Sequence, residues 1–229
     1  MPSCWQQTAA LALLPSLSVA CGRVSYSIKN KPLAFHVAVH GKAGSGKTQF
    51  TCAPATFVQG YLSRNDNSLR HEIEIREAYI DEHGLLFCPK VLGFEISTVQ
   101  LSKYLRFAEK ETVMLYTDEI SSAVASDGGN CSFLQLQPML RKAYDGIEHT
   151  MDYKDKDSFR GKIKPRLSYL VCGTPVTMFR YFSPQATEQG TTRRTILVEH
   201  PMYRDPVKDV SYTQEERDYI HSELDWLGQ

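Results

Sequence analysis

The stretch that decides the fold reads GKAGSGKT and consists of Gly41, Lys42, Ala43, Gly44, Ser45, Gly46, Lys47 and Thr48. It matches the pattern G-x-x-x-x-G-K-[ST], in which glycines let the backbone wrap so that successive N–H groups point at phosphate oxygens. Lys47 supplies a positive charge for the β- and γ-phosphates, and the Thr48 hydroxyl is the expected ligand of Mg²⁺. We therefore expect this segment to cradle the phosphates of ATP, bound with Mg²⁺.

Apolar segments around this loop give the context that the motif requires. The run Leu33 to His40 (LAFHVAVH) is typical of a buried strand, and residues 49–62 predict the following helix, with a kink at Pro54. Further buried strands are expected at residues 112–117, 167–172 and 195–199. Strands separated by helices predict an α/β fold, namely a P-loop NTPase with a three-layer α/β/α core and a mostly parallel sheet.

Other segments predict helices and loops. Helices are expected over residues 5–20, over residues 97–109 with Ser97 as N-cap, over residues 133–144, and after the capping box Thr213 to Glu216. Residues 65–84 predict a solvated helix, and residues 126–132 (SDGGNCS) predict a flexible loop. The mixed-charge residues 149–164 predict an exposed loop or hairpin, which either contacts DNA or is an ordinary solvated surface.

Two acids follow the predicted strand at residues 112–117. In VMLYTDE, the strand ends directly before Asp118 and Glu119. An apolar strand that ends in two acids lets the first hold Mg²⁺ through water and the second polarise the attacking water. A strand ending in solvated acids is also common, but an upstream phosphate-binding loop favours the Walker B interpretation. Thr48 and Asp118 are therefore the expected metal ligands.

Polar residues also flank the last two predicted strands. Thr174 follows LSYLVCG and could contact the γ-phosphate or the attacking water, or could simply belong to a Gly-Thr-Pro turn. Arg193 and Arg194 precede the final strand. One of them could neutralise transition-state charge, in cis or from a neighbouring subunit, or the two could form a solvated basic pair.

Composition limits the remaining function classes. The chain has 229 residues, with 26 Lys and Arg against 26 Asp and Glu, so no global basic field indicates nucleic acid. Its six cysteines form no C-x-x-C pair, which predicts neither zinc nor disulfides and suits a reducing cytoplasm. Residues 9–20 superficially suggest a secretory signal. However, no basic residue precedes them and Pro15 interrupts them, so a packed helix and no membrane segment are expected.

Taken together, these segments resemble the P-loop, superfamily 3-like helicase domain of primase–helicase proteins from phages, plasmids and bacterial mobile elements. The resemblance covers about residues 5–200. It rests on the apolar helix before Tyr26, GKAGSGKT, the helix with Thr98, Tyr104 and Leu105, LYTDEI (115–120), FLQLQPMLRKAYDG (133–146), PRLSYLVCGTP (165–175) and GTTRR (190–194). It implies a RecA-like or AAA-like core, ring oligomers, and ATP hydrolysis coupled to DNA unwinding at replication origins.

The resemblance also assigns roles to individual residues. The family's Walker lysine corresponds to Lys47, its Walker acids to Asp118 and Glu119, and its arginine finger to Arg193 or Arg194. The chain departs from the family because no primase or zinc-binding domain precedes the ATPase and little helical lid follows residue 229. It is therefore expected to be a fragment, the product of a split gene, or a stand-alone ATPase.

The sequence thus predicts a cytoplasmic ATPase domain of a mobile-element replication helicase, with single-stranded DNA, a primase and copies of itself in a ring as partners. One domain is expected over residues 1–229, with an N-terminal helical segment (1–30), an NTPase core (31–200) and a C-terminal helical extension (201–229). Two alternatives stay open at this point. One is an ATP-driven enzyme of another class, such as a small-molecule kinase, and the other is a nucleotide-binding regulator without helicase activity.

Overall fold

The computed structural model describes residues 3–22, 25–26, 31–48, 90–108, 111–120, 133–152, 160–182, 184–188, 190–202 and 212–227. The strands are β1 (Ser25–Tyr26), β2 (Lys31–Pro32), β3 (His36–His40), β4 (Val91–Gly93), β5 (Val113–Thr117), β6 (His149–Asp152), β7 (Arg160–Ile163), β8 (Leu167–Gly173) and β9 (Ile196–Glu199). The helices are α1 (Ser3–Ala20), α4 (Thr98–Ala108), α6 (Phe133–Asp145), α7 (Pro175–Tyr181), α8 (Pro184–Glu188), α9 (Gln214–Leu227) and the short 3-10 helix η2 (Thr192–Arg194).

Five strands form one parallel sheet in the order β4-β5-β8-β3-β9. β8 lies at its centre, and all seven of its residues are buried. Gly173 at the end of β8 is opposite His40 at the end of β3, which is opposite Glu199 at the end of β9. Because β5 also ends beside β8, these strands all finish at one side of the sheet, here named the carboxyl edge. The opposite side is the amino edge.

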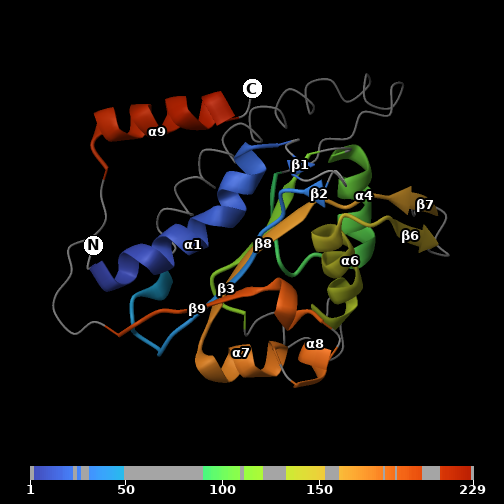
Figure 1. The fold of residues 1–229 in the computed structure, drawn as a ribbon, viewed down its shortest axis with the longest axis horizontal. Coiled ribbons are helices and arrows are strands. Elements are labelled where there is room, and N and C mark those ends of the chain that lie inside the picture. Colours follow the sequence, from blue (N-terminus) through green and yellow to red (C-terminus); the bar gives the residue numbers. More distant parts are fainter. Residues whose placement is uncertain are drawn as a thin grey trace.

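Helices cover both faces of this sheet, so the chain has an α/β fold with two apolar cores (Figure 1). Along β3, Val37 and Val39 face α1, whereas Ala38 between them faces the core that contains α4 and α6. This alternation follows from the two-residue period of a strand. Burying each Val or Leu side chain contributes about 1.5–3 kcal/mol, so both faces of a central strand must be apolar.

The helix α1 packs on the sheet as expected, against β3, β5 and β8. Its Ser18 is buried and donates a hydrogen bond of 2.6 Å to the Pro15 carbonyl. The Ser18 hydroxyl also lies 2.6 Å from the Ser168 hydroxyl in β8, which accepts a 3.0 Å bond from the Phe35 amide.

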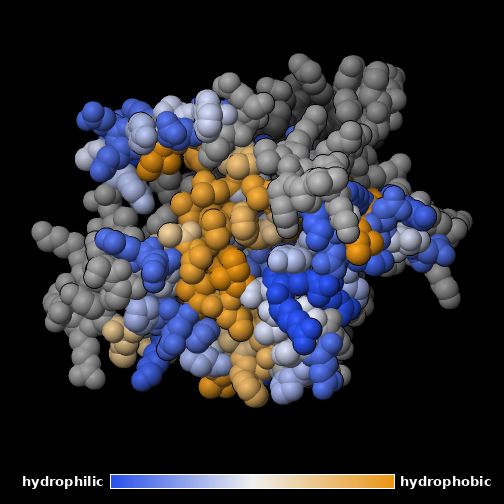
Figure 2. Space-filling model, in the orientation of Figure 1, coloured by the Kyte–Doolittle hydropathy of each residue, from blue (hydrophilic) through white to orange (hydrophobic). Residues whose placement is uncertain are grey.

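Figure 2 shows apolar surface gathered where α1 crosses the sheet. Among the described helices, none has the length and apolar character that crossing a membrane requires.

Most of the expected elements are confirmed. The predicted strands correspond to β3, β5, β8 and β9, although β3 begins at His36 rather than at Leu33. Ser97 does cap α4, since its hydroxyl accepts a 3.1 Å bond from the Gln100 amide. The capping box before α9 is also present, with the Glu216 amide 3.2 Å from the Thr213 hydroxyl. The expectations for residues 49–62, 65–84 and 126–132 lie outside the described residues.

The structure also contains elements that the sequence did not predict, namely β1, β2, β4, α7, α8 and η2. The sheet has a fifth strand, β4, whose three residues are too few to form a recognisable pattern. The mixed-charge segment forms the antiparallel hairpin β6–β7, but it is not exposed throughout. Met151 and Ile163 on this hairpin are buried in the core that contains α4 and α6, so the hairpin is anchored at its base.

Gly173 ends β8 where no side chain fits. A Cβ there would lie 2.7 Å from the Ile120 Cγ2 atom and 2.8 Å from the Thr177 hydroxyl oxygen. Gly93 at the end of β4 faces open space. We therefore expect Gly173→Ala to lower the free energy of unfolding by about 1–3 kcal/mol. Gly93→Ala should change it by no more than about 0.5 kcal/mol. Urea denaturation of both variants measures the difference, and equal midpoints would contradict this packing.

Candidate phosphate-binding site

The loop Gly41–Thr48 begins where β3 ends, at the carboxyl edge. Gly44 and Gly46 have φ angles of 72° and 79°, a backbone region that residues with a Cβ atom rarely adopt. Gly41 is needed for another reason, because a Cβ there would lie 2.9 Å from the His200 carbonyl oxygen. The three glycines therefore give the loop a tight path that other residues could not follow.

Lys47 lies inside this loop and only 8 % of its surface is exposed. Its Nζ donates a 3.1 Å hydrogen bond to the Lys42 carbonyl, which also accepts a 3.2 Å bond from the Ser45 amide. No carboxylate within the described part of the chain forms an ion pair with Lys47. A buried cation without a counter-charge is costly, so this arrangement favours an anionic ligand.

Asp118 and Glu119 follow β5 at the same edge and are both exposed. The Thr117 hydroxyl accepts a 3.3 Å bond from the Glu119 amide and donates a 3.1 Å bond to the Glu119 carbonyl, which makes a tight turn. The chain then returns to the sheet, because the amide of the fully buried Ile120 donates a 2.8 Å bond to the Cys172 carbonyl in β8. The two acids thus project from a short turn anchored at both ends.

The central strand β8 connects the loop with the acids. The Gly41 amide donates a 3.2 Å hydrogen bond to the Gly173 carbonyl, so the loop begins directly beside the end of β8. Neighbouring strands lie about 4.8 Å apart, which places the end of β5 roughly 10 Å from the end of β3. The structure therefore brings together the residues that the sequence predicted as phosphate and metal ligands at the carboxyl edge, where α/β sheets bind their ligands.

Thr174 lies at this edge between the loop and the acids, but its hydroxyl has a structural partner. It is the N-cap of α7, and its Oγ1 accepts a 3.4 Å bond from the Thr177 amide. The Thr177 hydroxyl accepts a 2.9 Å bond from the Thr174 amide in return. The reciprocal pair is a capping box, which explains a threonine here without any contact to a ligand.

Arg193 and Arg194 lie at the amino edge, away from the loop. They precede β9, whose Ile196 pairs with Val37 in β3. A strand rises about 3.3 Å per residue, so roughly 20 Å separate the backbone of Arg194 from that of Gly41. The structure therefore does not bring the arginine pair to the glycine-rich loop of the same chain.

The two arginines also differ from each other. Arg194 donates from Nε and Nη2 to the two carboxylate oxygens of Asp145, at 3.0 and 2.7 Å, and from Nη1 to the Gly190 carbonyl at 2.8 Å. The hydrogen bond to Asp145 raises the pKa of Arg194. Arg193 is exposed and has no ion pair or hydrogen bond with a described residue. Arg194 is thus engaged within its own chain, whereas Arg193 can reach outward.

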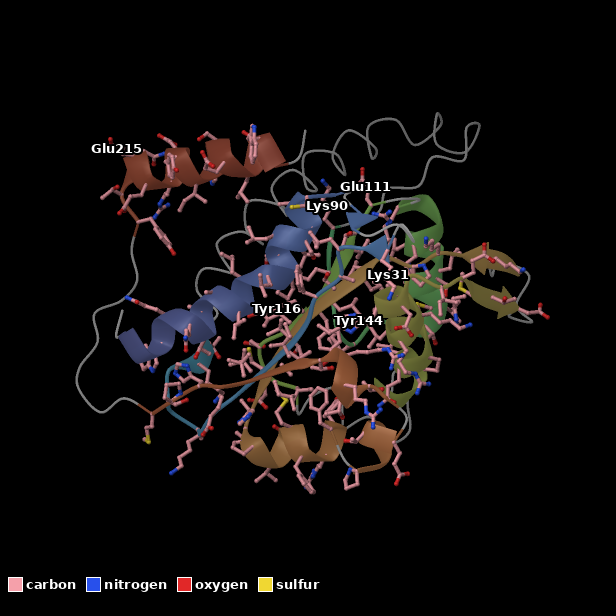
Figure 3. The ribbon with its side chains drawn as sticks, viewed as in Figure 1. Lys31, Lys90, Glu111, Tyr116, Tyr144 and Glu215 are labelled. Carbon is pink, nitrogen blue, oxygen red and sulfur yellow. The ribbon has the colours of Figure 1, made fainter. Side chains whose placement is uncertain are left out.

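A cavity of about 340 Å³ opens beside the arginines at the amino edge. It is lined by both arginines, the first residues of β3 and β9, and Tyr144, which lies beside the start of β3 with its ring centroid 5.6 Å from that of His36 (Figure 3). Burial lowers the pKa of His36 to about 4, so this ring is neutral at pH 7. No residue of the glycine-rich loop lines this cavity.

Sequence patterns gave no sign of His200, which contacts the loop, or of Trp5, which packs on His200. The His200 Nε2 atom lies 2.9 Å from the Ser45 carbonyl oxygen, although the two residues are 155 positions apart. The Trp5 ring in α1 packs on His200 with centroids 4.9 Å apart. A single histidine after a strand and a tryptophan in an apolar helix both look like ordinary core residues, so only the fold identifies them.

No protein-family model matches this chain, and none of the curated proteins matches it significantly. A functional conclusion therefore depends on the geometry of the carboxyl edge and on the chemistry of the residues there.

The arginines permit a direct stability test. Arg194→Ala removes two hydrogen bonds to a carboxylate that is 26 % exposed, so we expect the free energy of unfolding to fall by about 1–2 kcal/mol. Arg193→Ala should change it by no more than about 0.5 kcal/mol. Chemical denaturation measures both effects, and a double-mutant cycle with Asp145→Ala isolates the pair. Additive effects of Arg194→Ala and Asp145→Ala would contradict the assignment.

Proposed function

We propose that this chain is an ATP-binding and ATP-hydrolysing P-loop NTPase of the RecA or AAA type, the ATPase module of a mobile-element DNA replication helicase. One observation carries the ATPase proposal. A glycine-rich loop with the buried Lys47 lies at the end of β3, and the acids Asp118 and Glu119 lie at the same edge, with the strand β8 between them. This arrangement supports a phosphate-binding role of the loop beside groups that could hold a metal ion and activate water.

The residues of the loop fit a polyphosphate. The Lys47 ammonium is buried without a carboxylate partner among the described residues. The Ser45 hydroxyl is also buried and has no hydrogen-bond partner within the same ranges. An anion with several oxygens would satisfy both groups together with the backbone N–H groups of Gly44 and Gly46. The loop's inward-facing cation and unsatisfied donor therefore support a nucleoside triphosphate as ligand.

Thr48 and Asp118 are the residues that would hold Mg²⁺, and Glu119 is the proposed base for the attacking water. The described residues contain no group of three or more His, Cys, Asp or Glu side chains arranged to hold a metal ion. This agrees with Mg²⁺ chemistry, because the ion keeps several waters and uses only one or two protein ligands together with the phosphates. When bound, Mg²⁺ would neutralise charge that develops on the phosphate oxygens.

Two substitutions test the ATPase proposal. Lys47→Ala should weaken ATP binding by at least about 100-fold, because it removes the buried cation of the loop. Glu119→Gln should retain ATP binding but lower turnover by roughly 100-fold or more, because it removes the base and preserves the shape. Titration calorimetry and a phosphate-release assay measure the two effects.

The matched control is Lys31→Ala, which removes a lysine in β2, outside the sheet that carries the loop (Figure 3). Unchanged ATP affinity in Lys47→Ala would overturn the phosphate-binding proposal. Unchanged turnover in Glu119→Gln would overturn only the role of Glu119.

The helicase part of the proposal is supported by the resemblance and by the hairpin β6–β7. Figure 1 shows this hairpin projecting from the body of the molecule. Its Lys162 and the following Lys164 are exposed, and the 3.8 Å contact between Lys162 and Glu148 is a solvated pair that phosphates could replace. In this proposal the protein acts in the cytoplasm as a homo-oligomeric ring on single-stranded DNA, with a primase as partner. Stimulation of the phosphate-release rate by single-stranded DNA measures this coupling.

We further propose that Arg193 completes the ATP site of a neighbouring subunit. It is exposed and lies roughly 20 Å from the loop of its own chain, whereas Arg194 is engaged by Asp145. An arginine supplied across an interface stabilises transition-state charge and contributes roughly 10³- to 10⁵-fold in rate. This arrangement would couple hydrolysis to assembly, because a site becomes complete only when its neighbour is docked.

Mixing two inactive variants tests this arrangement. In a ring that contains Lys47→Ala and Arg193→Ala subunits, some interfaces pair an intact loop with an intact arginine. We therefore expect phosphate release to reappear on mixing. The matched control mixes Lys47→Ala with Glu119→Gln, which damage the same site in cis, so no interface can regain a complete set. Equal activity in both mixtures, with co-assembly shown by light scattering, would contradict a role of Arg193 in trans.

A further inference from the structure

His200 is joined to the phosphate-binding loop by both its backbone and its side chain. It follows β9 directly and is 2 % exposed. Its amide donates a 2.7 Å hydrogen bond to the carbonyl of His40, the residue before the loop. Its ring Nε2 lies 2.9 Å from the Ser45 carbonyl oxygen within the loop. A residue at the end of the edge strand is thus bonded to the chain on both sides of Gly41.

The contact with the Ser45 carbonyl determines the direction of a neighbouring N–H group. The Ser45 carbonyl and the Gly46 amide belong to one planar trans peptide, in which C=O and N–H point in opposite directions. A hydrogen bond that holds the carbonyl toward His200 therefore directs the Gly46 N–H away from His200. Gly46 has a φ of 79°, so its backbone has alternative conformations available and benefits from an external restraint.

The protonation state of the His200 ring allows its Nε2 atom to donate a hydrogen bond. Burial is the main cause that lowers the pKa of His200, and the nearby Lys47 ammonium lowers it further, while the bond to Ser45 acts in the opposite direction. The ring is therefore neutral at pH 7. Because a carbonyl oxygen only accepts hydrogen bonds, the single ring proton lies on Nε2.

The ring is also held in place by its surroundings. The Trp5 ring packs against it with centroids 4.9 Å apart and planes tilted by 36°. The Trp5 Nε1 atom donates a 2.9 Å bond to the carbonyl of Pro201, the next residue. On the other side, a Cβ at Gly41 would lie 3.1 Å from the His200 Cβ, so the loop approaches as closely as a glycine allows. His200 therefore cannot turn away from Ser45 without disturbing its neighbours.

We infer that His200 is a positioning residue of the nucleotide site: it donates from Nε2 to the Ser45 carbonyl and thereby aims the Gly46 N–H at the phosphates. This inference rests on the proposed function, because only a bound nucleotide would give the Gly46 N–H group a phosphate to bind. His200 itself does not touch the nucleotide. Its effect is on affinity for phosphate groups, through the backbone of the loop.

Three substitutions of His200 separate positioning from packing. In His200→Gln the side-chain amide nitrogen takes about the place of Nε2 and can still donate to Ser45. In His200→Asn the shorter side chain carries the same group only to about the place of Nδ1, where it does not reach. His200→Leu keeps apolar packing against Trp5 and has no donor. The Gln and Asn variants are the decisive pair, because they share one chemistry and differ only in reach.

The measured quantities are the Kd for ATP and for ADP by calorimetry and the Tm without nucleotide. We expect His200→Gln to keep the wild-type Kd within about threefold, and His200→Asn and His200→Leu to weaken both nucleotides about tenfold, the worth of one hydrogen bond. The control Trp5→Phe retains the ring beside His200 and loses the bond to Pro201, so it should lower Tm without changing Kd. A purely structural role of His200 would likewise move Tm and leave Kd unchanged.

The outcomes distinguish this inference from the function on which it rests. If the wild-type protein binds no nucleotide, both are overturned. A second outcome is that the wild type binds ATP and the Lys47→Ala variant does not, but His200→Asn and His200→Gln bind ATP with equal affinity. In that case only the role of His200 is overturned. If His200→Leu does not fold, as judged by circular dichroism, the comparison of Asn with Gln still decides.

Discussion

The parallel pairing of β8 with both β3 and β5 is the constraint on which the rest of the structure depends. All seven residues of β8 are buried, and its two neighbours pair with it along their lengths. Parallel strands carry their carboxyl ends to one edge, so the loop after β3 and the acids after β5 meet there. Without β8 between them, the glycine-rich loop and the pair Asp118–Glu119 would have no fixed relation.

The loop is held from several distant parts of the chain. Its first amide is bonded to Gly173 at the end of β8, and its middle carbonyl, from Ser45, is bonded to His200 after β9. The ring of Trp5 in α1 packs against the ring of His200. These contacts come from opposite ends of the sequence, so the conformation of a short glycine-rich segment depends on the whole domain. This is a physical reason for expecting the loop to form only in the folded protein.

The two edges of the sheet have different roles in the proposed mechanism. The carboxyl edge carries the glycine-rich loop, the acids and Thr174, whereas the amino edge carries Arg193, Arg194 and the cavity beside His36. Since roughly 20 Å separate the backbone of Arg194 from that of Gly41, one chain cannot bring Arg193 to its own glycine-rich loop. If the arginine takes part in hydrolysis, a second copy must supply it, and the geometry of the sheet then makes activity depend on assembly.

The sequence by itself determined the main strands, several helix boundaries and the loop. Buried parallel strands are continuous apolar runs, N-caps have a local signature, and the glycines at 44 and 46 are required by the backbone angles of the loop itself. These are local properties, because residues close together in the sequence determine them. Only the tertiary structure decided the strand order, the position of β4, the capping role of Thr174, the pairing of Arg194 with Asp145, and the contact of His200 with Ser45. Each of these except the capping box joins residues far apart in the chain, and even Thr174 could be assigned only once its partner Thr177 was seen. Contacts of this kind arise from the packing of whole elements, for which a single sequence carries no periodic signal.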